Sequence, residues 1–129
     1  MTRRHVSSGT EWEDRVGYSR AVRVDGQVHV AGTTATDDDG AVVGGDDPYA
    51  QTKRALANVE AALSEAGATP ADVVRTRIYV VDADDWQAVG RAHAETSGDV
   101  RPAATMVEVS RLVDPAMLVE VEATAVVDE

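Results

Sequence analysis

The stretch MLVEVEATAVV, residues 117–127, alternates between two kinds of side chain. Successive side chains of a β-strand point to opposite faces, so this alternation predicts a strand in a sheet with two unlike faces. One face would carry Met117, Val119, Val121, Ala123 and Ala125, and the other Leu118, Glu120, Glu122 and Thr124. The first set suits a packed core, and the second suits solvent or a partner subunit.

Toward the N-terminus, further segments predict strands of the same sheet. Pro102 precedes one at about 103–109, and another covers about 73–81, with Ile78 and Val80 on one face. Its other face carries Arg75, Arg77 and Tyr79. The runs 16–24 and 27–33 flank Asp25-Gly26, which is a hairpin turn signal. The polar, glycine-rich segment 37–45 reads as a loop with a short strand at 42–43.

Two helices are predicted between these strands. Asp47 is a suitable N-cap, Pro48 suits the first position, and Gly67 suits the C-terminal end. Apolar or small residues recur between them at helical spacing, namely Thr52, Leu56, Val59, Leu63 and Ala66. The second helix runs from about 84 to 96, with Trp86 predicted to lie in the core. The order predicts an α+β fold, a mixed sheet with both helices on one face.

Composition limits the possible functions. The 129 residues suit a single domain, 1–129, and the net charge is −11, with 23 acidic and 12 basic residues. This charge opposes binding to nucleic acids or to anionic membranes. It fits a soluble surface or adaptation to high salt. No apolar run suits a membrane span or signal peptide, so a cytoplasmic location is expected.

Metal and cofactor chemistry has little support in the sequence. The chain has no cysteine, and its three histidines, His5, His29 and His93, show no ligand spacing. No phosphate-binding glycine loop is present. We therefore expect no metal and no cofactor. The chain also lacks phenylalanine, so valine and alanine must fill a thin core, which favours burial between subunits.

Several motifs together resemble the Rid/YjgF family of reactive-intermediate deaminases. They are Gly17-Tyr18-Ser19, Val30-Ala31-Gly32-Thr33, Asn58-Val59, RPAATMVEV at 101–109 and VEVEA at 119–123. The resemblance spans nearly the whole chain. It implies a chorismate-mutase-like fold and a barrel-like homotrimer with a small-molecule cleft at each interface. The implied activity is cofactor-free deamination of enamines and imines such as 2-aminoacrylate.

The resemblance also assigns roles, and some are not met. Glu120 matches the glutamate that handles water, Tyr18 the tyrosine that closes the pocket, and Gly32 a contact glycine. Ala31 stands where the family has serine, and Gly90 where it has asparagine. Most importantly, Ala104 replaces the arginine that grips the substrate carboxylate.

Loss of that arginine removes a bidentate contact with the substrate carboxylate. Each of its two hydrogen bonds contributes roughly 1.5–3 kcal/mol to binding. Four arginines are candidates to replace it: Arg20, Arg75, Arg77 and Arg101. Each is also explained by salt bridges with the abundant acids. Without a replacement, Ala31, Ala104 and Met106 would line a more apolar pocket, suited to an uncharged ligand.

Two functions therefore remain open on the sequence alone. One is a hydrolase of enamine or imine metabolites, with Glu120 catalytic and substrate contacts from Tyr18, Ala31, Gly32, Arg101, Ala104 and Met106. The other is a small-molecule-binding trimer without chemistry. A nuclease or translation inhibitor is disfavoured, because a trimer would carry three times the negative charge of one chain. Trp12, in a predicted loop, is expected to flank the cleft.

Overall fold

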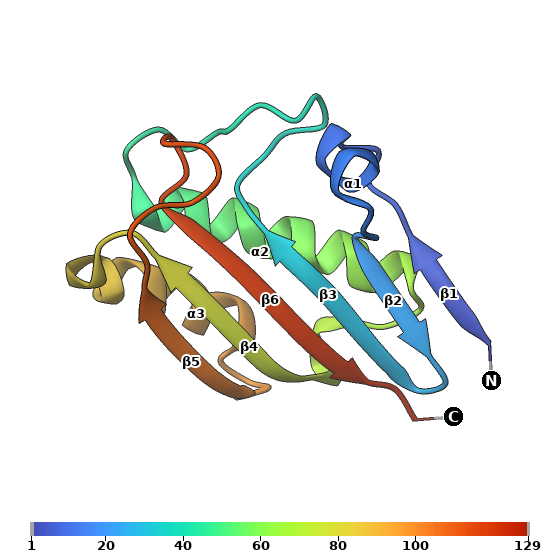
Figure 1. The fold of residues 1–129 in the computed structure, drawn as a ribbon. Helices are drawn as coiled ribbons and strands as arrows, with labels where there is room; N and C mark the ends of the chain where they lie inside the picture. Colours follow the sequence, from blue (N-terminus) through green and yellow to red (C-terminus); the bar gives the residue numbers. More distant parts are fainter. Residues whose placement is uncertain (1, 129) are drawn as a thin grey trace.

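The computed structural model describes residues 2–128 as a six-stranded sheet with helices packed on it (Figure 1). The strand order is β1-β2-β3-β6-β4-β5, and all neighbours are antiparallel except β4 and β5, which are parallel. The strands are β1 (Arg3–Val6), β2 (Ala21–Val24), β3 (Gln27–Thr33), β4 (Val73–Val80), β5 (Ala103–Glu108) and β6 (Val119–Val126). The predicted mixed sheet is confirmed.

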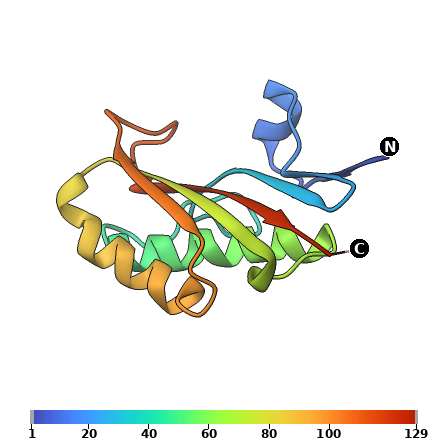
Figure 2. The ribbon, with the colours of Figure 1, turned by 90° about the horizontal axis from the view of Figure 1, so that it is seen from below.

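The two long helices, α2 (Pro48–Glu65) and α3 (Trp86–Ser97), lie on one face of the sheet, as predicted (Figure 2). The Asp47 side chain caps α2 by accepting hydrogen bonds from the backbone N–H groups of Tyr49 and Ala50, at 3.0 and 3.3 Å. The core between sheet and helices consists mainly of valine, alanine and leucine. No helix among the described residues is long and apolar enough to cross a membrane.

The other face of the sheet carries the polar set of β6 and the set of β4 that contains Arg75, Arg77 and Tyr79. We call it the open face, because neither long helix covers it (Figure 2). A third helix, α1 (Glu11–Val16), stands on this side, beside β1 and β2. The apolar residues that alternate along β6 thus point to the helix-covered face, where Val119 and Val121 are fully buried.

The N-terminal segment differs from its predicted loop. It forms β1, which extends the sheet by pairing with β2, and then α1, which ends at Gly17 with φ of 87°. A positive φ is unfavourable for residues with a Cβ, so glycine suits this end of the helix. Neither element is periodic in sequence: β1 has four residues and α1 has six. Their existence depends on the neighbours that they contact.

Two smaller expectations also change. Trp86 is 58% exposed, so its predicted place in the core is wrong. It begins α3 directly after the 3₁₀ turn η2 (Ala83–Asp85), and Val89 and Ala92 form the buried stripe instead. The strand expected at 42–43 is reduced to one bridge between Thr36 and Val42. A second 3₁₀ turn, η1 (Pro70–Asp72), connects α2 to β4.

Candidate functional site

A cavity of about 900 Å³ lies between α1, the end of β3 and α2. Tyr18, Gly32 and Glu120, which the resemblance singled out together, all line it. The segment before α1 and the loop after β3 complete the wall. Trp12 also lines the cavity, as expected for a flanking residue, but from α1 and not from a loop.

Glu120 and Gly32 lie in direct contact at the cavity wall. A Cβ added to Gly32 would stand 2.7 Å from Oε2 of Glu120, which is closer than Cβ atoms in proteins come to other heavy atoms. Only glycine therefore lets the carboxylate rest against the backbone of β3. Burial raises the pKa of the Glu120 carboxyl, and the nearby charge of Glu122 raises it further, while Arg20 acts in the opposite direction.

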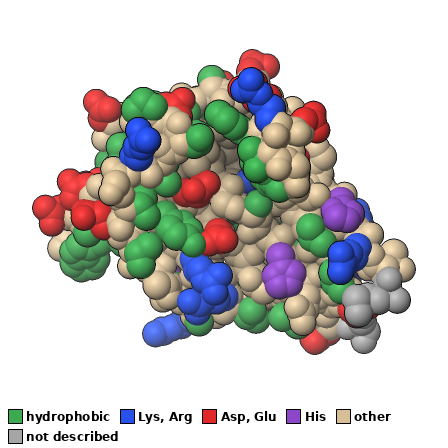
Figure 3. Space-filling model, in the orientation of Figure 1, with side chains coloured by type: hydrophobic (Ala, Val, Ile, Leu, Met, Phe, Trp, Pro, Cys, Tyr) green, Lys and Arg blue, Asp and Glu red, His purple; other side chains and the backbone are tan. Residues whose placement is uncertain are grey.

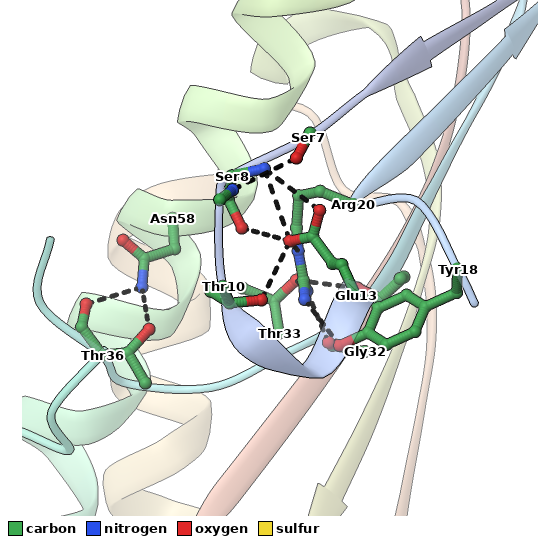
Figure 4. A network of polar contacts seen from close by, with 12 residues as sticks. Ser7, Ser8, Thr10, Glu13, Tyr18, Arg20, Gly32, Thr33, Thr36 and Asn58 are labelled. Carbon is green, nitrogen blue, oxygen red and sulfur yellow. Dashed lines mark hydrogen bonds and ion pairs between the residues drawn. The ribbon is translucent and has the colours of Figure 1, made fainter. Parts of the chain in front are cut away.

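Arg20 joins the elements around this carboxylate (Figure 4). Its Nη1 donates to the Gly32 carbonyl at 2.6 Å and to the Thr33 hydroxyl at 3.0 Å. Its Nη2 donates to the Tyr18 hydroxyl at 3.1 Å, and its Nε lies 3.5 Å from Oε2 of Glu13. A guanidinium has five N–H donors, and four of them have partners here. Arg20 is therefore a strut between α1 and β3, with little capacity left to hold a substrate carboxylate.

Glu13 is the buried anchor of this strut, with 4% of its side chain exposed. It accepts hydrogen bonds from the Ser8 backbone and hydroxyl and from the Thr10 hydroxyl. Burial acts to raise the pKa of the Glu13 carboxyl, but the hydrogen bonds from Ser8, Ser7 and Thr10 outweigh it and lower the pKa. The carboxylate thus stays ionised and holds α1 against the sheet. Sequence reasoning missed this residue.

Asn58 fixes the loop on the opposite side of the cavity. Its Nδ2 donates to the carbonyls of Thr34 and Thr36, both at 3.0 Å. Figure 4 shows the contact with Thr36. This contact gives a physical role to the Asn58-Val59 motif, because it ties the segment after β3 to α2.

The cavity is lined by an excess of acidic side chains: Glu11, Asp37, Asp38, Asp39, Glu65 and Glu120. Among the described lining residues, Arg20 is the single basic one, and its charge is already matched by Glu13. Such a surface creates a negative potential that favours neutral or cationic ligands over anions.

The remaining site candidates lie elsewhere in this chain. Arg101, Ala104 and Met106 belong to β5 or its approach, at the end of the sheet opposite β1, and do not line the cavity. Ala104 pairs with Thr76, whose hydroxyl lies 2.9 Å from Nε2 of His93 in α3. It therefore faces the helix side, whereas Glu120 faces the open side. Ala31 adjoins Gly32 without lining the cavity.

Of the four arginines proposed as replacements, the structure brings Arg20 alone to the cavity. Arg75 and Arg77 stand on the open face beside a separate, smaller hollow. Arg101 is exposed, just before β5. Within one chain, then, Tyr18, Gly32 and Glu120 come together at the cavity, and Ala104 stays apart from them.

Comparisons with known proteins show the family to which the chain belongs. The family model described as endoribonuclease L-PSP matches residues 10–127. The chain belongs to this family. A solved structure from Mycobacterium tuberculosis, described as a member of the highly conserved YjgF/YER057c/UK114 family, has a TM-score of 0.90 and 54% identity, covering 98% of this chain and 100% of that one. The resemblance to the YjgF family is thereby confirmed.

Two curated relatives of this L-PSP family chain are similar over most of their length. An uncharacterized protein of Streptomyces coelicolor is 43% identical over 122 residues, 95% of this chain and 90% of its own. A RutC family protein of Pyrococcus abyssi is 40% identical over 109 residues, 84% of each chain. These relatives support the family and the fold, and neither name states a substrate.

Proposed function

We propose that this L-PSP family protein is a cofactor-independent hydrolase that deaminates reactive enamine or imine metabolites, with Glu120 as the catalytic group. The observation that carries the proposal is the Glu120 carboxyl, half-buried at the cavity wall with a raised pKa. A carboxyl with a raised pKa exchanges protons more effectively near neutral pH. Tyr18 and Gly32 lie at the same wall and would shape the space for substrate.

The reaction needs only water and a proton carrier. Water adds to the carbon of the C=N bond, while Glu120 accepts one of its protons. The carboxyl then returns this proton to nitrogen, which gives an adduct with one hydroxyl and one amino group. As the C–N bond breaks, the hydroxyl proton passes by way of the Glu120 carboxylate to the nitrogen, so ammonia leaves and a carbonyl compound remains. An enamine enters the same sequence after protonation at carbon gives the imine.

The preferred substrate would lack a carboxylate. Ala104 offers no guanidinium, Arg20 is held by Glu13, and the cavity lining is mainly acidic. Each of these features disfavours 2-aminoacrylate, the usual anionic substrate implied by the resemblance. A neutral imine, or its protonated iminium form, fits the negative potential better.

We also infer a homotrimer in which β5 of one subunit completes the cavity of the next. Ala104 and Glu120 face opposite sides of the sheet in one chain, so a shared site requires a second chain. Light scattering of the purified protein should therefore give three times the chain mass. A monomeric mass would contradict this part of the proposal.

The alternative is a trimer that binds small molecules in the same cavity without chemistry, which the loss of the arginine favours. The deciding experiment generates two kinds of imine in situ: an amine oxidase gives imines without a carboxylate, and an amino-acid oxidase gives imino acids. We expect wild type to accelerate ammonia release from the first kind and Glu120→Gln not to. No acceleration of either imine by wild type would favour the binding trimer.

An Ala104→Arg variant tests the role of the missing arginine. We expect it to raise the rate on imino acids at least tenfold, because bidentate contacts contribute more than the roughly 1.4 kcal/mol that corresponds to tenfold. Ala103→Arg is the matched control, since the neighbouring side chain points to the other face of the strand. Equal rates for both variants would contradict an inter-subunit site at position 104.

A further inference from the structure

We propose that the open face of the sheet holds a second binding site, specific for a small tetrahedral oxyanion such as phosphate. The site is a hollow of about 100 Å³ that is separate from the large cavity. It is lined by His29, Val30, Arg75, Arg77, Glu122, Ala123 and Thr124. Taking roughly 30 Å³ per water molecule, the hollow has room for about three waters or for one small oxyanion.

The sheet register brings the lining side chains together from three neighbouring strands. Thr124 of β6 is paired with His29 of β3 on one side and with Arg75 of β4 on the other. One step along, Arg77 is paired with Glu122. Adjacent strands lie about 4.8 Å apart, so guanidinium, hydroxyl and imidazole groups converge on the hollow. In Figure 3, which views this face, basic and histidine side chains lie close together around its middle.

Arg75 carries an unmet hydrogen-bond donor at this place. Its Nη2 donates to the Thr105 hydroxyl at 3.2 Å, but its Nε is buried and has no partner among the described residues. Buried donors in folded proteins are nearly always paired, so an unpaired one calls for a missing partner. An oxyanion oxygen in the hollow would accept from this Nε.

The charge balance of the hollow also favours an anion. Neither Arg75 nor Arg77 forms an ion pair with any described residue, although acidic residues outnumber basic ones 23 to 12 in the chain. Glu122 is the one acid at the hollow, and its carboxylate already accepts a hydrogen bond from the Tyr79 hydroxyl. Two guanidinium groups against one carboxylate leave a net positive charge. Paired guanidinium groups are a common means of recognising phosphate.

The recognition chemistry is the same for free phosphate and for the phosphate group of a metabolite, so both are tested. Isothermal titration of the whole protein would use inorganic phosphate in one arm and glycerol 3-phosphate in the other, at constant ionic strength set with sodium chloride. We expect saturable binding in at least one arm, with one site per chain. Binding of phosphate alone would indicate a free ion, and binding of the ester would indicate a phosphorylated metabolite.

Two variants locate the site. Arg75→Gln and Arg77→Gln should each weaken binding at least tenfold, while Arg15→Gln, which removes the same charge from exposed α1, should leave it unchanged. If Arg75→Gln alters the fold or the mass measured by light scattering, exposed Arg77 decides the matter. No saturable binding by wild type, or equal binding by wild type and Arg77→Gln, would overturn the proposal. In that case the arginines would instead face carboxylates of a second copy.

Discussion

Arg20 and the pair Arg75–Arg77 show how differently the same side chain is used in two regions of one sheet. The side chain of Arg20, at the large cavity, is 12% exposed. It forms an ion pair with Glu13 and donates hydrogen bonds to Tyr18, Gly32 and Thr33. The open-face pair has no acid partner among residues 2–128, and Arg75 has a buried donor that pairs with none of them. A saturated arginine holds the structure together, whereas an unsaturated one is available to a ligand. The number of bonding partners of an arginine thus distinguishes a structural role from a ligand-binding role better than its distance from a cavity does.

The sharpest test of this contrast is Arg20→Met. It leaves the buried Glu13 carboxylate without its cation, and breaking a buried pair in this way costs about 3 kcal/mol. We therefore expect the free energy of unfolding, measured by urea titration, to fall by about that amount. Arg15→Met, which loses an exposed pair with Glu11, should change it by less than about 0.5 kcal/mol. Equal losses in both variants would break the comparison.

Asn58→Ala tests an uncharged group with a full set of partners. The variant removes one donor from each of the carbonyls of Thr34 and Thr36, which keep the bonds from the Thr36 backbone and from Arg54, so we expect a loss of about 1 kcal/mol. Faster amide exchange in the loop after β3 should accompany it. Gln87→Ala, which removes an exposed amide from α3, is the control and should have little effect. An unchanged loop would mean that Asn58 does not anchor it.

Glu13 and Glu120 should differ in the sign of their pH dependence. The lowered pKa of Glu13 means that its stabilising effect is present above the usual carboxyl range and lost as pH falls through the folded-state pKa. The raised pKa of Glu120 means that the folded state binds its proton more tightly than the unfolded state. Its contribution therefore favours folding at low pH and declines as pH rises through the folded-state pKa.

Glu120→Gln should accordingly be more stable than wild type at pH 7, and this advantage should shrink as pH falls through the raised folded-state pKa of Glu120 and be lost once pH reaches the usual carboxyl range. Glu13→Gln should be less stable than wild type at pH 7, with a difference that also shrinks in acid. Urea titrations at pH 7 and at lower pH values measure both. A destabilised Glu120→Gln protein at pH 7 would contradict the assignment of Glu120 as a strained, functional carboxylate.

The smallest effect is expected for Arg77→Gln. Exposed Arg77 makes no hydrogen bond or ion pair with the described residues, so its loss should change the free energy of unfolding by less than about 0.5 kcal/mol in phosphate-free buffer. Added phosphate should then stabilise wild type more than the variant. A large loss without phosphate would indicate that Arg77 holds a subunit contact.

Much of the fold was predictable because long elements are periodic. The alternation of β6 predicted which residues are buried, and Asp47, Pro48 and Gly67 predicted the limits of α2. β1 and α1 were not predictable, because each is too short for a pattern and depends on contacts with β2 and β3. Trp86 is likewise exposed because it directly follows the turn before α3, and the spacing of hydrophobic residues gives no sign of that turn.

The candidate site was predictable only in part, for a related reason. Tyr18, Gly32 and Glu120 carry a family motif, so sequence alone brought them into one hypothesis. The strut formed by Glu13 and Arg20 depends on how α1 folds back, and no spacing rule reveals it. For the open-face hollow, the sequence placed Arg75 and Arg77 on one strand face. That neither has an ion-pair partner in the described part of the chain becomes evident only once the strand register is known.

The two outer strands of the sheet are protected very differently. β1 carries Arg3, Arg4 and His5 on its four residues, and charge at a sheet edge discourages pairing with other chains. β5 reads AATMVE, with its single charge at the last residue, and its outer edge has no partner strand in the described chain. A single chain would therefore be prone to pair with other chains along β5. Precipitation on dilution or storage should start there, and a lysine placed at Thr105 would be expected to improve solubility.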